Sequence, residues 1–196
     1  FMAQARHIGK LVLVPGGEKA VVPRQGTVLV TGAMGALGQH VARWLAREHG
    51  VKHIILTSRR GPEAPGAEAL VEELAALGAS ASVVACDVSN RDAVSSLLQA
   101  IPADKPLRGV IHSAGVLDDG LLADLNPDRL ARVLAPKVGG AWQLHVLTKQ
   151  ADLELALAAA GSIFPVKKPA ETPDDLVCGF RGDAEQFLTF EPATKT

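Results

Sequence analysis

The sequence predicts an α/β fold, a Rossmann-like doubly wound parallel sheet. From Gly26 onward, short β-branched runs alternate with segments of helical periodicity, and a glycine-rich turn follows the first run. Hydrophobic residues make up 47% of the chain and charged residues 21%, as in an ordinary globular domain. The candidate strands are Thr27–Val30, His53–Thr57, Ser82–Ala85, Gly109–His112 and a weaker fifth, Leu153–Ala158.

Three apolar stripes at helical spacing lie between these runs, and each is predicted to cover a face of the sheet. Their members are Leu37, Val41, Trp44 and Leu45; Leu70, Leu74 and Leu77; and Val94, Leu97, Leu98 and Ile101. Ser89 is the predicted N-cap of the third helix, and Pro102 is predicted to close it.

Charge and composition exclude several classes of protein. A net charge of -1 over 196 residues gives no electrostatic drive toward nucleic acid or anionic lipid. Two cysteines do not make a secreted disulfide scaffold, so we expect a reducing, cytoplasmic location. No apolar run is long enough for a membrane helix, and the six histidines lack metal-ligand spacing, so neither a membrane nor a metal site is expected.

The glycines at 32, 35 and 38 stand between the first strand and the first helix. This spacing lets the backbone approach a pyrophosphate, while free N–H groups and the positive helix end attract its charge. Glycine also serves ordinary turns and helix packing, but the strand before and the helix after favour a dinucleotide site. The residues expected to bind the cofactor here are Thr31, Gly32, Met34, Gly35, Ala36 and Leu37.

The second strand ends at Ser58, Arg59 and Arg60. A carboxylate at this place would hold a ribose 2′-hydroxyl, whereas cations accept a 2′-phosphate. The two arginines therefore favour NADPH over NADH. The alternative is a solvated charged loop end.

The third and fourth strands also end in candidate cofactor residues. Cys86, Asp87 and Val88 follow the third strand, where the carboxylate could accept a hydrogen bond from the adenine amine or could equally be a turn aspartate. The fourth strand ends in His112, Ser113, Ala114 and Gly115. The small residues in this segment let the backbone approach the cofactor. His112 suggests catalysis, although a lone histidine at a strand end is more often simply accommodated.

Together, Thr31–Gly38, Ser58–Arg60, Cys86–Val88 and His112–Asp119 resemble the ketoreductase domain of modular polyketide synthases, a branch of the short-chain dehydrogenase/reductase superfamily. The resemblance covers about residues 24–155. Leu134–His145 is similar to the helix that carries the family's catalytic lysine, which implies Lys137; the alternative is an exposed helix lysine. Leu117, Asp118 and Asp119 resemble the signature of ketoreductases that set a D-configured 3-hydroxyl.

The resemblance implies a reaction and its partners. In this family NADPH gives hydride to the β-keto carbon of a β-ketoacyl thioester tethered to an acyl carrier protein. A tyrosine protonates the oxygen, the lysine lowers the tyrosine pKa, and a serine positions the carbonyl. Residues 1–14 resemble the end of an enoylreductase domain, so residues 1–25 are assigned to its tail and a linker, 26–160 to the NADPH-binding part, and 161–196 to an unassigned tail.

The sequence departs from the family after about residue 160. In register, Gly161 stands at the serine position and Asp174 at the tyrosine position, and the chain has no tyrosine. We therefore expect a sheet truncated after the fifth strand and a ketoreductase portion that is incomplete and inactive alone. The alternatives are a non-catalytic nucleotide-binding or scaffolding segment, and a redox enzyme in which Lys137 or Asp118 replaces the proton donor.

Overall fold

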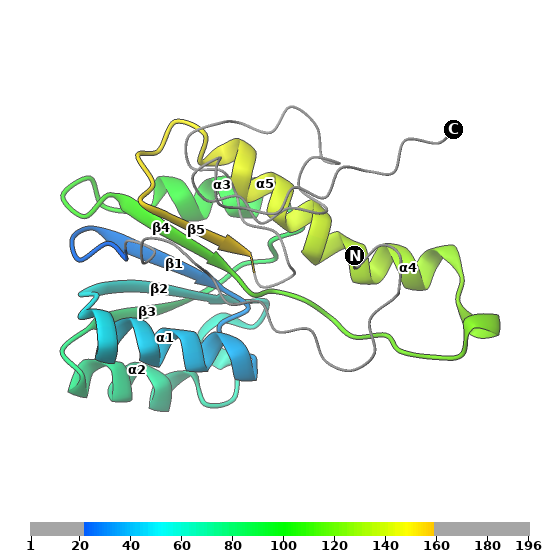
Figure 1. The fold of residues 1–196 in the computed structure, drawn as a ribbon, viewed down its shortest axis with the longest axis horizontal. Helices are drawn as coiled ribbons and strands as arrows, with labels where there is room; N and C mark the ends of the chain where they lie inside the picture. Colours follow the sequence, from blue (N-terminus) through cyan, green and yellow to red (C-terminus); the bar gives the residue numbers. More distant parts are fainter. Residues whose placement is uncertain (1–21, 159–196) are drawn as a thin grey trace, which may run out of the picture.

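The structure is a computed structural model that describes residues 22–158, with Figure 1 tracing the remainder in grey. Its sheet contains β1 (Thr27–Thr31), β2 (His53–Ser58), β3 (Ser80–Ala85), β4 (Leu107–His112) and β5 (Leu155–Ala158). All pairs are parallel, in the order β3-β2-β1-β4-β5. The five predicted strands are confirmed, with small shifts at their ends.

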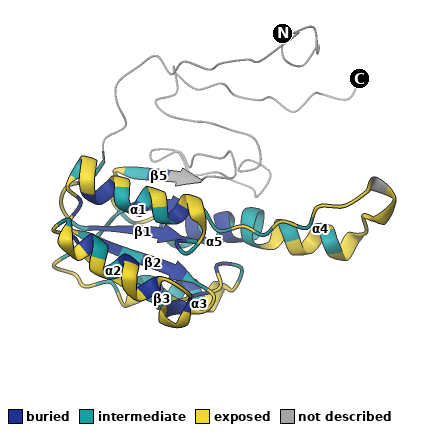
Figure 2. Cartoon of the chain, turned by 90° about the horizontal axis from the view of Figure 1, so that it is seen from below, coloured by how far each residue is buried: buried dark blue, intermediate teal, exposed yellow. Residues whose placement is uncertain are grey.

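Helices cover both faces of the sheet, which confirms the doubly wound class (Figure 1). On one face lie α1 (Ala36–His49) and α2 (Ala67–Ala76), and on the other α3 (Arg91–Gln99) and α5 (Gly140–Leu147). The helix α4 (Pro127–Leu134) projects beyond the sheet, as Figure 2 shows. Three short turns complete the described chain: η2 (Gly61–Glu63), η3 (Leu122–Asp124) and the π-helical turn η4 (Ala135–Gly139).

The central strand β1 is buried along its whole length because the sheet is covered on both sides. Val28 and Val30 point to one face and pack in a cluster with Leu45 of α1. Leu29 points to the other face and packs in a second cluster with Leu144 of α5. The continuous apolar run of β1 therefore serves two cores at once.

The stripe predicted for the first helix is partly wrong. Leu37 is 53% exposed and Trp44 40% exposed, whereas α1 buries Gly38, Ala42 and Leu45 against the sheet. A Cβ atom at Gly38 would lie 2.5 Å from the carbonyl oxygen of Gly32. Because this close approach turns the small-residue face of α1 inward, the neighbouring large side chains face outward.

The predicted N-cap of the third helix is also wrong by one residue. Asn90 caps α3, since its Oδ1 accepts hydrogen bonds from the backbone N–H groups of Asp92 (2.9 Å) and Ala93 (3.1 Å). Ser89 lies in the turn before the helix and donates its backbone N–H to Asp87 Oδ1. A cap must reach the N–H groups two and three positions ahead, and only Asn90 does so here.

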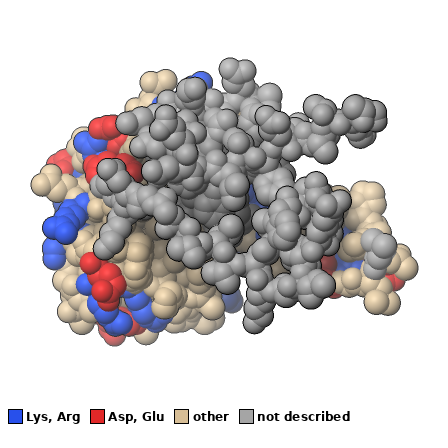
Figure 3. Space-filling model, in the orientation of Figure 1, with Lys and Arg blue, Asp and Glu red and all other residues tan. Residues whose placement is uncertain are grey.

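Within residues 22–158, no helix combines the length and apolarity needed to cross a bilayer. The same part of the chain contains no cluster of three or more His, Cys, Asp and Glu side chains suited to a metal ion. On the visible part of the surface in Figure 3, side chains of both charges lie side by side.

Candidate functional site

The carboxyl ends of β1, β2, β3 and β4 bring the predicted cofactor segments to one edge of the sheet (Figure 1). From β1 the chain moves outward through β2 to β3, then crosses to β4 on the other side of β1. This reversal creates a switch point between β1 and β4, where doubly wound folds bind their ligands.

The glycine turn lies at this switch point. Gly32 has φ +64°, and a Cβ atom there would lie 2.5 Å from the Cα atom of Ala114. The backbone N–H of Ser113 donates to the carbonyl of Thr31 over 3.1 Å, which holds β4 against the turn. Gly32 is thus required by both its conformation and the close approach of β4.

The N-terminus of α1 follows the turn directly. Its N-cap is Gly35, which has no capping side chain, and its first turn has no acidic residue. No side chain therefore competes for the first N–H groups of this 14-residue helix, and its positive dipole end is not neutralised. Of the predicted residues, Met34 lies in the glycine turn, and Ala36 and Leu37 begin α1.

At the end of β2, Ser58 Oγ is buried and has no hydrogen-bond partner among the described residues. A buried hydroxyl without a partner costs free energy, and a bound polar group would remove that cost. Arg59 and Arg60 follow it, and both are exposed and form no ion pair with another described residue. Their positive charge is available to an anion.

At the end of β3, Cys86 is buried, and its burial, with a smaller effect of the Asp87 charge, raises the pKa of the thiol above its ordinary 9.0. The thiol therefore stays protonated at neutral pH and is not an activated nucleophile. Asp87 is exposed, and its carboxylate accepts a hydrogen bond from the Ser89 N–H at 2.9 Å, as is typical of a turn aspartate. The adenine contact of Asp87 stays a prediction, and Val88 is buried in the core.

At the end of β4, the ring of His112 is 1% exposed and uses both nitrogens. Its Nε2 lies 2.9 Å from the carbonyl oxygen of Pro136, which can only accept, so Nε2 carries the hydrogen. Burial lowers the pKa of the ring below 6.5, so the ring is neutral and Nδ1 accepts from Thr31 Oγ1 at 2.7 Å. The ring is thus accommodated, and Ser113, Ala114 and Gly115 continue the strand end.

Lys137 lies on the π-helical turn η4. The expected single helix over 134–145 is instead α4, η4 and α5, because Pro136 lacks the N–H that would continue α4 and its ring crowds the preceding turn. The Lys137 side chain is half-buried, and its Cε lies 3.4 Å from the position of a Cβ built on Gly115. Its ammonium forms no hydrogen bond or ion pair with another described residue.

The segment between β4 and α4 is held by an arginine that the sequence analysis missed. Arg129 donates to Asp118 Oδ1 from Nε (2.9 Å) and Nη2 (2.6 Å), and Arg132 donates to Asp118 Oδ2 (2.8 Å). Arg129 also donates to the backbone carbonyls of Asp118, Asp119 and Asp124. A carboxylate bound by two guanidinium groups is a poor proton donor, so nothing here favours Asp118 as the replacement acid.

This arrangement makes the 118–124 segment sensitive to acid. The hydrogen bonds from Arg129 hold the pKa of the Asp118 carboxyl below its usual 3.8. The folded state therefore gains from the ionised form above about pH 4 and loses this gain as the pH falls through the lowered pKa. We expect Asp118→Asn to speed exchange of the Arg129 Nε–H proton with solvent at neutral pH, since this N–H donates to Asp118 Oδ1 in the unsubstituted chain.

The control for this prediction is Asp124→Asn. Only the backbone carbonyl of Asp124 accepts from Arg129, so this variant keeps every contact of Arg129. Equal exchange in both variants at neutral pH would contradict the assigned role of the Asp118 carboxylate.

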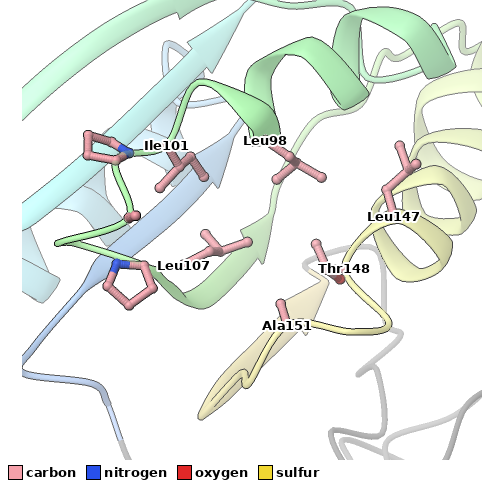
Figure 4. A pocket seen from close by; sticks show the side chains of 9 residues that line it. Leu98, Ile101, Leu107, Leu147, Thr148 and Ala151 are labelled. Carbon is pink, nitrogen blue, oxygen red and sulfur yellow. The ribbon is translucent and has the colours of Figure 1, made fainter.

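A groove of about 270 Å³ lies elsewhere, between α3, the start of β4 and the end of α5 (Figure 4). Its walls are apolar apart from Thr148, and its labelled lining residues are Leu98, Ile101, Leu107, Leu147, Thr148 and Ala151. Leu107 is the first residue of β4, so the groove belongs to the opposite edge of the sheet from the glycine turn. None of its lining residues has a titratable side chain.

Gly161 and Asp174, which stand at the family's serine and tyrosine positions, lie outside the described residues, as does the tail over 161–196. Most of the predicted linker over 1–25 also lies outside them.

Comparison with known proteins gives a consistent result. The family described as KR domain matches residues 26–166. Polyketide synthase GfsB of Streptomyces halstedii is 57% identical over 153 residues, 78% of this chain and 3% of the relative. Mycoketide-CoA synthase of Mycobacterium tuberculosis is 50% identical over 153 residues, 78% of this chain and 4% of the relative.

Solved structures agree with these relatives. A structure described as an A-type ketoreductase from a modular polyketide synthase has 46% sequence identity and a TM-score of 0.66, over 74% of this chain and 30% of that chain. The chain therefore spans about a third of such structures and a few per cent of the curated synthases.

Proposed function

The chain belongs to the KR domain family of modular polyketide synthases, and from this premise we propose that it forms the NADPH-binding portion of a β-ketoacyl reductase. The substrate class would be a 3-ketoacyl thioester on an acyl carrier protein, reduced to the 3-hydroxyacyl thioester. Neighbouring synthase domains in the cytoplasm would be its partners. The D-configured product implied by Leu117–Asp119 stays a prediction.

The residues at the sheet edge fit NADPH. The free N–H groups at the start of α1 suit the pyrophosphate, since no side chain caps them. Ser58, Arg59 and Arg60 would hold the 2′-phosphate, since they offer one unpartnered hydroxyl and two unpaired cations. Ser113, Ala114 and Gly115 would form the floor of the site.

NADPH, when bound, supplies the hydride. The contribution of this chain is to bind and orient, and Lys137 contributes a free ammonium beside Gly115 at the same edge. The described residues offer no strong proton donor: the His112 ring is neutral with both nitrogens engaged, and the Asp118 carboxylate is bound by arginine. The chain is therefore proposed to bind NADPH without efficient reduction.

The observation that carries the proposal is the unpartnered Ser58 hydroxyl next to two free arginines, and nucleotide binding tests it. We expect NADPH to bind more tightly than NADH. Replacing Arg59 and Arg60 together with alanine should lower NADPH affinity by about tenfold or more, because charge-assisted hydrogen bonds contribute roughly 1.5–3 kcal/mol. NADH affinity should hardly change, and fluorescence titration measures both.

Arg47→Ala is the matched control for this pair, since Arg47 is an exposed arginine at the far end of α1. It should leave both affinities unchanged. An equal loss of NADH and NADPH affinity in the double variant would contradict recognition of the 2′-phosphate.

A scaffolding role is favoured by one separate observation. Leu117, Leu121 and Leu130 lie on the projecting α4 and the segment before it, and they are 84%, 73% and 59% exposed. Exposed leucines in such number are typical of a protein contact. A gel-filtration shift with an added neighbouring synthase domain, without any nucleotide requirement, would support this role.

A further inference from the structure

His112 joins three segments that are distant in the sequence. It lies opposite Thr31 in the register of β4 with β1, and its Nδ1 accepts from the Thr31 hydroxyl at 2.7 Å. On the other side of the ring, Nε2 donates to the carbonyl of Pro136 at 2.9 Å. The glycine turn and the π-helical turn are thus connected through one buried ring.

The bond to Pro136 acts directly on the next residue. The carbonyl of Pro136, the backbone nitrogen of Lys137 and the Cα atom of Lys137 share one peptide plane. Fixing the direction of that carbonyl therefore fixes the plane from which the lysine side chain departs. The carbonyl of Pro136 lies in the π-helical turn η4, where the regular helical hydrogen bonds are interrupted. A hydrogen bond from a strand residue therefore supplies a constraint that the turn itself lacks.

The segment directly after β4 also limits the side chain of Lys137. Its Cε lies 3.4 Å from the position of a Cβ on Gly115, three residues beyond His112. On the other side of the ring, a Cβ built on Gly140 would lie 3.3 Å from His112 Cε1. The ring is confined between Thr31 of β1 and the start of α5, with little space to turn.

We propose that His112 is a positioning residue, which aims Lys137 at the cofactor edge through the carbonyl of Pro136. The inference rests on the proposed function, in which Lys137 serves the NADPH site. The ring itself contacts neither substrate nor cofactor, and its role depends on the Nε2 donor.

Two amide substitutions test the two hydrogen bonds of the His112 ring separately. The amide of glutamine reaches the position of the imidazole Nε2, so His112→Gln keeps a donor for Pro136. The amide of asparagine reaches only the position of Nδ1, so His112→Asn keeps the Thr31 contact and loses the Pro136 contact. Thr148→Val is the control, because it removes a buried hydrogen bond to Leu144 far from Lys137.

Two measurements on the full chain report the position of the Lys137 side chain and its protection by NADPH. The first is the nuclear Overhauser effect between the Lys137 Cε protons and the Gly115 Cα protons, measured without nucleotide. The second is acylation of Lys137, followed by peptide mass spectrometry with and without NADPH, with Lys52, Lys105 and Lys149 as internal references. Thermal unfolding confirms that each variant is folded.

We expect the Overhauser effect in the unsubstituted chain, His112→Gln and Thr148→Val, and its loss in His112→Asn. NADPH protection of Lys137 should fall by about tenfold in His112→Asn alone, in keeping with the loss of one buried hydrogen bond. An Overhauser effect that is equal in the Asn and Gln variants would overturn the proposal. Absence of NADPH protection in the unsubstituted chain would instead count against the proposed function, leaving the Overhauser result to decide the role of His112.

Discussion

Gly32→Ala is expected to abolish NADPH binding and to lower the free energy of unfolding by about 3 kcal/mol or more. Gly32 has φ +64°, a left-handed conformation that costs alanine about 1–2 kcal/mol. The added Cβ would also lie 2.5 Å from Ala114 Cα and 2.6 Å from Ala114 N, which are backbone atoms of the segment directly after β4. The turn and β4 would have to separate, and the cofactor edge would open.

Gly50→Ala separates the two causes. Gly50 has the same φ, 64°, at the C-cap of α1, but a Cβ there would have no heavy atom within 4 Å. This variant should lose only about 1–2 kcal/mol and keep its NADPH affinity. Urea unfolding and NADPH fluorescence measure both variants. If the two lost equal stability, the close approach of β4 to the turn would be refuted as the cause.

Turnover by the purified chain is expected to be about 10²- to 10⁴-fold lower than that of a complete ketoreductase, the range attributed to a general acid. The sequence has no tyrosine. Among the described residues, Cys86 is buried, His112 is neutral and engaged, and Asp118 is ionised between two arginines. Oxidation of NADPH in the presence of a β-ketoacyl thioester is the measurement.

Binding must be measured beside turnover, since a chain that does not bind NADPH would also fail to oxidise it. Tight NADPH binding with negligible turnover is the expected pair of results. Efficient turnover that disappears in Lys137→Ala or Asp118→Asn would identify that residue as a replacement acid and contradict the prediction.

Much of the fold could be predicted because its signals are local. Strand runs such as Val28–Val30 and glycines that follow a strand are recognisable within a few residues. The errors arose where packing chose between local alternatives. The sequence favoured Leu37 and Trp44 as the inner face of α1, but the close approach of Gly38 to Gly32 places the small residues of the helix against the sheet.

The candidate site was predictable to the same degree. The position of the candidate residues at the ends of β1, β2, β3 and β4 could be predicted, and the parallel strands bring them to one edge, whereas their contact with a cofactor stays a prediction. No sequence pattern indicated that Arg129 would organise the 118–124 segment, or that the Pro136 carbonyl would accept from His112. Neither contact belongs to a motif of fixed spacing.

The sequence by itself determined that this chain builds a parallel sheet with a glycine turn between its first strand and first helix, because both depend on the conformational preferences of neighbouring residues. The tertiary structure decided that His112 binds Thr31, 81 residues away, and Pro136, 24 residues away. Such contacts depend on which strands become neighbours and how closely they pack. That is settled only when the sheet assembles and its buried polar groups must find partners.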